Sequence, residues 1–197
     1  MIVELGALVL REAARQQSAW KRKGFPIKLS VNVSARQLSE GGFLTAATDA
    51  IALANADAAD IELEITERLM LGGEHRVIDL LQELKSVGFR ISIDDFGTGY
   101  SNLAELHRFP IDCLKIDRSF VANLKDHGPL TSLIISMCQL MKFHIVAEGV
   151  ESSEQLAWLA ERSCDEYQGF LFSPAVDASE FEAMLAEQAT DRQTCAA

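Results

Sequence analysis

The chain alternates short apolar segments with amphipathic stretches almost from end to end, and this alternation limits its fold more than any other feature. After a first helical pattern at residues 3–23, the apolar segments lie near residues 27–33, 61–65, 91–93, 113–116, 145–147 and 167–170. Helical periodicity follows them near residues 34–56, 76–87, 102–108, 130–142, 153–162 and 178–187. A serial strand–helix pattern predicts parallel strands joined by right-handed crossovers.

Polar side chains stand at the ends of nearly all predicted strands. In a closed barrel these ends gather on one face, whereas in an open doubly wound sheet they spread apart. We therefore predict an α/β fold, a TIM-type (βα)8 barrel. The pattern contains about six strands where the closed barrel needs eight, so we expect the barrel to be incomplete at its N-terminus. We assign residues 1–188 to this single domain and expect residues 189–197, which lack an apolar period, to form a disordered tail.

The strand ends carry oxygen donors that suit a hard metal ion. They are Asn32, Glu64, Asp94, Asp95 and Glu148. Carboxylate and amide oxygens without histidine or cysteine favour magnesium or manganese over zinc. Adjacent strand residues point to opposite sides, so Asp94 and Asp95 face one site only if the backbone turns, and Gly97 and Gly99 permit a turn.

Lys115 lies inside an apolar strand between Leu114 and Ile116. Its ammonium points either into the barrel mouth or toward the helix layer, and a bland interpretation is a buried lysine paired with Asp117. Because Asp117 follows two residues later, both side chains share one face with the other strand-end groups. A cation there can orient water or stabilise a developing phosphoryl charge.

Charge and cysteine content exclude several classes of partner. The net charge is −11 and residues 21–23 form the only basic run, so a DNA or RNA duplex is not expected as a ligand. A phosphate ligand would need divalent cations to offset the carboxylates. Four cysteines without ligand spacing indicate reduced thiols and a cytoplasmic location. The apolar runs are too short to cross a bilayer, so no membrane contact is expected from this chain itself.

Six motifs occur in order, at residues 31–34, 64–67, 94–101, 114–117, 147–151 and 168–169. Together they resemble the EAL domain, the cyclic-di-GMP-specific phosphodiesterase family, over nearly the whole chain. The resemblance implies a TIM-type barrel with one irregular strand. It also implies hydrolysis of the bacterial second messenger cyclic di-GMP to linear pGpG at a two-metal site that uses Mg²⁺ or Mn²⁺ and is inhibited by Ca²⁺.

The same resemblance implies roles for individual residues. The metal ligands would be Asn32, Glu64, Asp94, Asp95 and Glu148. Lys115 would help to position the attacking water, Glu67 would hold the loop at residues 95–101, and Glu148 and Glu151 would complete the catalytic group. Ligand contacts would come from Asp117, Gln168, Gly97 and Thr98.

One departure from the family pattern affects activity. The Glu-Ala-Leu signature, with a metal-binding glutamate and a nearby phosphate-binding arginine, is expected upstream of Met1, so we expect this chain alone to hydrolyse poorly. A catalytically impaired cyclic-di-GMP receptor is one alternative, and an unrelated barrel enzyme with Lys115 as base and one magnesium is another. Family resemblance further suggests upstream sensory or GGDEF domains and admits a homodimer.

Overall fold

The computed structural model describes residues 1–72, 75–98 and 106–195. Most of the helix expected near residues 102–108 lies outside these ranges. So do the glycine at position 99 and the two residues after it, which belong to the predicted metal-site loop.

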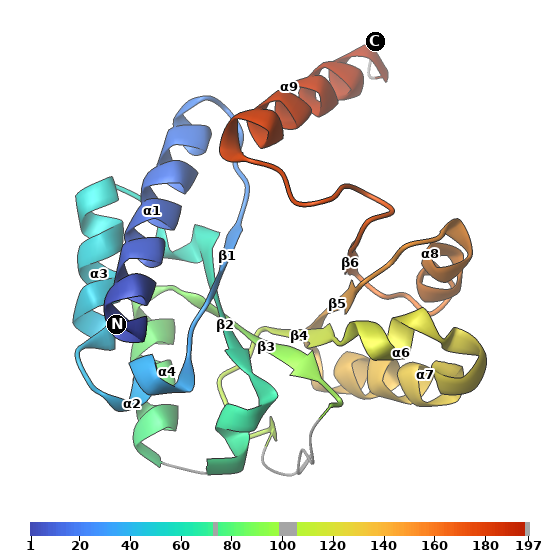
Figure 1. Cartoon of the computed structure of the whole chain (residues 1–197), viewed down its shortest axis with the longest axis horizontal. Coiled ribbons are helices and arrows are strands. Elements are labelled where there is room, and N and C mark those ends of the chain that lie inside the picture. Colours follow the sequence, from blue (N-terminus) through green and yellow to red (C-terminus); the bar gives the residue numbers. More distant parts are fainter. Residues whose placement is uncertain (73–74, 99–105, 196–197) are drawn as a thin grey trace.

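Within these ranges, six parallel strands form a single curled sheet, in which each strand pairs with its neighbour in the sequence. The strands are β1 (Leu29–Asn32), β2 (Ile61–Thr66), β3 (Arg90–Phe96), β4 (Cys113–Ile116), β5 (His144–Glu148) and β6 (Glu166–Gln168). Figure 1 shows the sheet as a half-barrel, with β1 and β6 at its two edges. The predicted α/β fold, an incomplete TIM-type barrel, is therefore confirmed.

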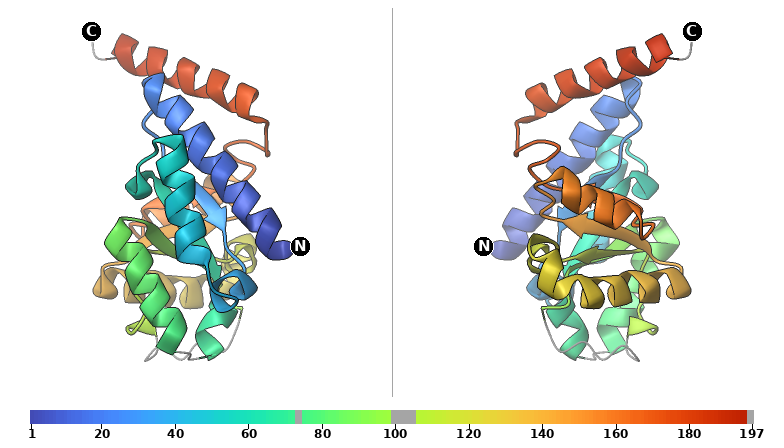
Figure 2. Two further views of the ribbon diagram at one scale, coloured as in Figure 1. Left: turned by 90° about the vertical axis from the view of Figure 1, so that its left-hand side faces the viewer. Right: turned by 90° about the vertical axis from the view of Figure 1, so that its right-hand side faces the viewer.

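The described residues include eight α-helices, most of which cover the convex side of the sheet. They are α1 (Ile2–Arg22), α2 (Ala35–Ser39), α3 (Phe43–Ala54), α4 (His75–Val87), α6 (Arg118–Ala122), α7 (Leu124–Met141), α8 (Ser153–Ala160) and α9 (Ala178–Cys195). Short 3-10 helices span Ala58–Asp60 and Glu67–Gly72. Helices α1 to α4 accompany the first half of the sheet and α6 to α8 the second half (Figures 1 and 2). Within the described residues, no helix is both long and apolar enough to cross a membrane.

Four helices differ from the sequence prediction. Helix α6, which begins shortly after β4, is not among the predicted helices. The single helix expected after β1 is split into α2 and α3, because Gly41 and Gly42 take left-handed backbone angles (φ of 82° and 77°) that end a helix. Helix α7 begins before Pro129, which lies in its second turn and removes one helical hydrogen bond. Helix α9 continues to Cys195, beyond the expected end at Glu187. The domain bounds and the disordered tail at 189–197 stay predictions.

The two faces of the sheet differ in character because side chains alternate along each strand. The convex face carries the core, including Leu63, Ile93 and Leu114, which are at most 1% exposed. The concave face carries polar groups, among them Glu64 and Lys115. Burial of Ile and Leu on one side therefore forces the polar residues between them into the barrel interior.

The last helix packs against the end of the first. The rings of Trp20 and Phe181 lie 5.3 Å apart between centroids, and Trp20 Nε1 donates to Glu182 Oε2 at 3.1 Å. Lys23 forms an ion pair with the same glutamate. These contacts fix α9 beside the C-terminal end of α1 (Figure 1), on the side of the sheet that begins with β1.

Candidate functional site

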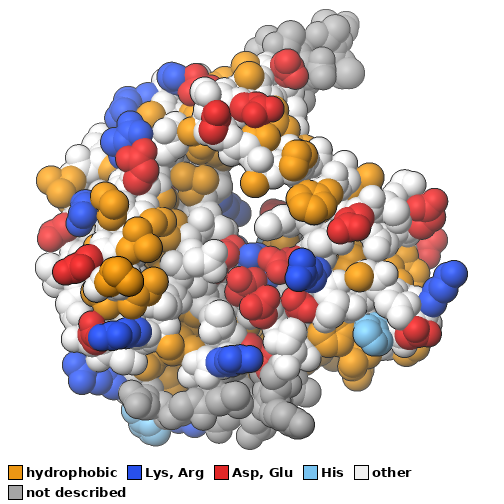
Figure 3. Space-filling view, in the orientation of Figure 1, with side chains coloured by type: hydrophobic (Ala, Val, Ile, Leu, Met, Phe, Trp, Pro, Cys, Tyr) orange, Lys and Arg blue, Asp and Glu red, His pale blue; other side chains and the backbone are white. Residues whose placement is uncertain are grey.

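Three carboxylates meet where β3 and β5 end. One oxygen from each of Asp94, Asp95 and Glu148 lies within 4.8 Å of the other two. Figure 3 shows acidic side chains gathered at the centre of this face, beside a hollow and with basic side chains near them. The sequence prediction that acidic strand ends converge holds for these three side chains.

A backbone irregularity brings Asp94 and Asp95 to the same side. Asp95 has φ of 56°, in the left-handed region that non-glycine residues seldom adopt, and the pairing of β3 with β4 shifts register between Ile93 and Phe96. The extra residue cancels the usual alternation of side chains. The necessary turn was expected at Gly97 and Gly99, but the structure places it at Asp95 itself.

Lys115 is the buried cation of the site. Its Nζ lies 2.6 Å from Glu148 Oε1, 2.9 Å from Glu64 Oε1 and 3.2 Å from Asp94 Oδ1, and its side chain is only 6% exposed. The bland alternative, a pair with Asp117, is wrong: Asp117 instead caps α6, where its side chain accepts from the backbone N–H of Ser119 at 3.0 Å. One ammonium is thus shared by carboxylates from three strands.

The pKa shifts follow from the burial of these groups and from the excess of carboxylates over the single ammonium of Lys115. Burial alone would lower the pKa of Lys115, but hydrogen bonds to Glu148 and Glu64 raise it well above its usual value. Burial raises the pKa of Glu148, and the charges of Asp94 and Glu64 add to the effect of burial. Burial and the neighbouring charges of Asp94 and Asp117 likewise raise the pKa of Asp95. The site therefore carries more negative charge than Lys115 can offset.

Glu67 is a buried anchor for the loop after β3. It begins the 3-10 helix after β2, is 2% exposed, and its Oε2 accepts from the Gly97 backbone N–H at 2.8 Å. Gly97 has φ of 99°, and a Cβ there would lie 2.5 Å from the Phe120 ring, so only glycine fits. The hydroxyl of Thr98 donates to the Asp95 carbonyl at 2.9 Å, which closes the described part of the loop on itself.

Two pockets share Asp95 as a wall. The first, of about 450 Å³, is lined by Asp95, Asp117, Arg118, Glu148, Gly149, Glu151, Gln168, Gly169 and Phe170. The second, of about 430 Å³, is lined by Thr66, Glu67, Arg68, Asp95 and Thr98. We call them the Arg118 pocket and the Arg68 pocket. Most of the residues singled out from the sequence line one or the other.

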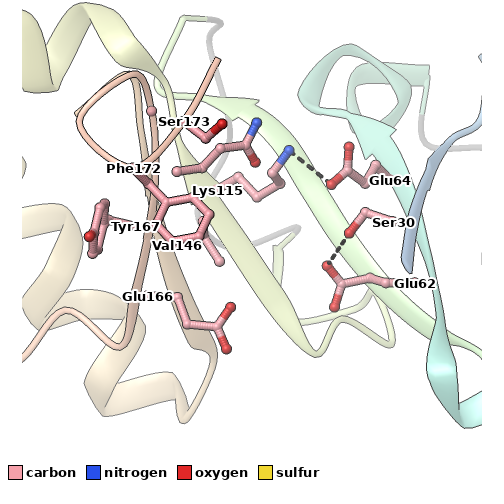
Figure 4. A pocket seen from close by; sticks show the side chains of 11 residues that line it. Ser30, Glu62, Glu64, Lys115, Val146, Glu166, Tyr167, Phe172 and Ser173 are labelled. Carbon is pink, nitrogen blue, oxygen red and sulfur yellow. Dashed lines mark hydrogen bonds and ion pairs between the residues drawn. The ribbon is translucent and has the colours of Figure 1, made fainter. Parts of the chain in front are cut away.

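A third pocket of about 300 Å³ lies on the concave face of the sheet. Figure 4 shows Lys115 reaching from β4 toward Glu64 on β2, with Ser30 and Glu62 bonded at 3.4 Å beneath them. Phe172 and Ser173, from the segment after β6, form the opposite wall. Lys115 thus lines this inner pocket while its ammonium contacts Asp94 and Glu148 of the carboxylate cluster.

The structure places the remaining predicted residues around the cluster. Asn32 ends β1 directly opposite Glu64 in the pairing register, which directs both side chains to the concave face. Glu151 and Gln168 line the Arg118 pocket, and Gln168 is the register partner of Glu148.

Sequence reasoning missed three residues that line the pockets: Arg118, Arg68 and Phe170. Each lies one or two residues beyond a quoted motif position, since Arg118 follows Asp117, Arg68 follows Glu67 and Phe170 comes two after Gln168. Their position directly after a strand end was the available signal.

The donor set suits a hard divalent cation. Asp94, Asp95 and Glu148 offer converging carboxylate oxygens, and the excess of negative charge over Lys115 would be relieved by a bound cation. Charge and donor chemistry agree in this fit, so Asp94, Asp95 and Glu148 form a candidate metal-binding cluster.

Comparison with known proteins places this arrangement in a family. The chain is 36% identical over 185 residues to cyclic di-GMP phosphodiesterase PdeR of Escherichia coli, an alignment that covers 92% of this chain and 28% of PdeR. It therefore spans about a quarter of that relative's length.

Two solved structures share the fold. The PaMucR phosphodiesterase in complex with c-di-GMP aligns with a TM-score of 0.88 at 35% identity, covering 91% of this chain and 74% of that one. Klebsiella pneumoniae BlrP1, in a manganese and cy-diGMP complex, aligns with a TM-score of 0.79 at 25% identity, covering 87% and 44%. The sequence profile of the EAL domain matches residues 1–175. The chain belongs to the EAL domain family.

Proposed function

We propose that this chain catalyses the metal-dependent hydrolysis of cyclic di-GMP to linear pGpG. The observation that carries the proposal is the meeting of Asp94, Asp95 and Glu148 within 4.8 Å, beside a buried lysine, in a chain of the EAL family. The names of the relatives, which include a c-di-GMP phosphodiesterase solved with its ligand, support the substrate.

We assign Mg²⁺ or Mn²⁺ to the carboxylates, with Asp94, Asp95 and Glu148 as ligands and Glu64 and Asn32 beside them. Such an ion lowers the pKa of a bound water and offsets charge on the phosphate. The manganese complex of BlrP1 supports this choice of metal. We expect Ca²⁺ to support binding without efficient turnover.

Lys115 acts as a fixed cation in this proposal. Because its pKa is raised, the ammonium stays protonated at neutral pH and cannot serve as a general base. It holds Glu64, Asp94 and Glu148 in place and donates toward the attacking water or the phosphoryl oxygen.

The remaining residues bind and orient the substrate. Glu67 holds the loop at Gly97 and Thr98, while Glu151, Gln168 and Asp117 border the pocket that would receive the nucleotide. In the reaction, water adds to one phosphorus and one ester P–O bond breaks. The phosphate remains on the 5′ oxygen of one nucleoside and the 3′ hydroxyl of the other becomes free. The second phosphodiester still joins the two nucleosides, so the ring opens to linear pGpG.

Isothermal titration with cyclic di-GMP tests the proposal. We expect binding in Ca²⁺, slow hydrolysis in Mg²⁺ or Mn²⁺ with pGpG as the product by mass spectrometry, and no binding in chelator. The dependence on metal has a physical reason, since a chain of net charge −11 with a carboxylate-lined pocket repels a dianionic ligand. Equal affinity in chelator and in Mg²⁺ would contradict the metal site.

Substitution of Lys115 by alanine distinguishes a role in the chemical step from a role in substrate binding. We expect turnover to fall more than affinity, because the ammonium acts mainly on the water or on transition-state charge. Equal losses in rate and affinity would place Lys115 in ground-state binding instead.

A further inference from the structure

Arg118 is a cation beside the carboxylate cluster that has no partner among the residues that the structure describes. It is exposed at the start of α6 and lines the Arg118 pocket together with Asp95 and Glu148. Within residues 1–72, 75–98 and 106–195, its side chain makes no hydrogen bond or ion pair, although acidic side chains line the same pocket. Its guanidinium is therefore available to an anion from outside the chain.

The backbone of Arg118 is fixed against the residue that follows Glu148. Gly149 has φ of +68°, and a Cβ added there would lie 2.5 Å from the Cβ of Arg118 and 3.3 Å from its Cα. The contact requires glycine at position 149, and it sets the base of the arginine directly beside the end of β5. The backbone that follows Glu148 thus fixes the position of Arg118 beside the end of β5.

The two cations beside the cluster have different partners. Glu64, Asp94 and Glu148 share the ammonium of Lys115, whereas Arg118 neutralises none of them. Once a divalent cation offsets the carboxylates, an arginine at the rim can receive an anion without competition from them. A guanidinium presents paired N–H donors that match two phosphate oxygens, which an ammonium cannot do.

We propose that Arg118 binds a phosphodiester of the cyclic dinucleotide in the Arg118 pocket. The inference rests on the proposed function and adds a substrate contact to it. Arg68, in the neighbouring pocket, is the rival for this role, since it too lacks a partner among the described residues. We favour Arg118 because its pocket contains both Asp95 and Glu148, whereas the Arg68 pocket contains only Asp95 of the cluster.

The test is titration of the full chain with cyclic di-GMP in Ca²⁺, and hydrolysis in Mg²⁺, for the parent and four variants. We expect Arg118→Ala to raise Kd roughly 10- to 100-fold, the loss typical of a charge-assisted hydrogen-bonded contact. Arg118→Lys should recover part of the affinity because it keeps the charge but not the paired donors. Arg11→Ala, an exposed arginine on α1 that lines none of the three pockets described above, should leave Kd unchanged.

The fourth variant, Arg68→Ala, decides between the two arginines. A larger loss of affinity in Arg68→Ala than in Arg118→Ala overturns the assignment. Parental affinity in Arg118→Ala also overturns it, whatever happens to turnover, while the proposed function stands because the parent still binds and hydrolyses. A parent that neither binds nor hydrolyses removes the proposed function itself, and this inference with it. The thermal transition of each variant should match that of the parent, since Arg11, Arg68 and Arg118 are all exposed.

Discussion

Replacement of Lys115 by methionine is the sharpest test of the buried charge network. Methionine keeps most of the side-chain volume, so the change removes the ammonium and leaves little cavity. Three carboxylates then lose a partner that lies 2.6 to 3.2 Å away. Removing one member of a buried ion pair typically costs about 3–5 kcal/mol, because the remaining charge stays desolvated. The side chains of Asp94 and Glu148 are 16% exposed and can relax toward water. We therefore expect Lys115→Met to lower the free energy of unfolding by about 3 kcal/mol in chelator.

Urea unfolding followed by circular dichroism, in chelator and in excess Mg²⁺, measures the effect. Mg²⁺ should restore part of the lost free energy of unfolding, because a bound cation offsets the same carboxylates. Lys85→Met is the matched control: its ion pair with Asp112 is 33% and 21% exposed, and its loss should cost about 1 kcal/mol or less. If Lys115→Met unfolds with the same free energy as Lys85→Met, the three carboxylates do not depend on the ammonium and the reasoning fails.

The pH dependence of this effect has a definite sign. The pKa of Lys115 is raised in the folded chain. The stability that the ammonium contributes is therefore fully present below the pKa of the unfolded chain, near 10.4, and is lost only as pH rises through the higher pKa of the folded chain. The destabilisation by Lys115→Met should therefore be the same at pH 8 and pH 9. A clear decrease between these two values would show that the lysine titrates in this range.

Three further outcomes follow from the geometry. Mg²⁺ or Mn²⁺ at 100 times Kd should stabilise the parent by about 2.7 kcal/mol. Asp94→Asn should abolish both this gain and hydrolysis while keeping the stability of the metal-free chain. An equal gain in the variant would exclude Asp94 as a metal ligand. Gly149→Ala should lower the free energy of unfolding by roughly 2–4 kcal/mol because the new Cβ meets Arg118. Gly24→Ala is the control, with φ of +91° and nothing within 4 Å of the new Cβ, and should cost only the backbone strain of about 1–2 kcal/mol. Equal losses in the two variants would refute the contact. Burial raises the pKa of Cys138 to about 12, so iodoacetamide at pH 8 should label this thiol only after unfolding; rapid native labelling of Cys138, read by mass spectrometry, would contradict its burial.

The sequence by itself determined the strands, their parallel order and the face that carries chemistry. Apolar residues with a period of two mark each strand, and the amphipathic segments between them require crossovers, so local pattern is enough to specify a barrel-like sheet. The same alternation commits Glu64 and Lys115 to the interior once Leu63 and Leu114 are buried on the other side. The polar strand ends were therefore predictable as a group.

Only the tertiary structure decided which of these groups meet. The left-handed backbone of Asp95 depends on the register shift against β4, and no local pattern fixes a register between strands far apart in the sequence. The three partners of Lys115 come from β2, β3 and β5, so their shared contact exists only when all four strands are aligned. The place of Arg118 likewise depends on a close approach between Gly149 and the start of α6. Side-chain direction at a strand end is set by backbone angles and by packing across the sheet. Composition and spacing therefore predicted which residues form the site but not which of them contact one another.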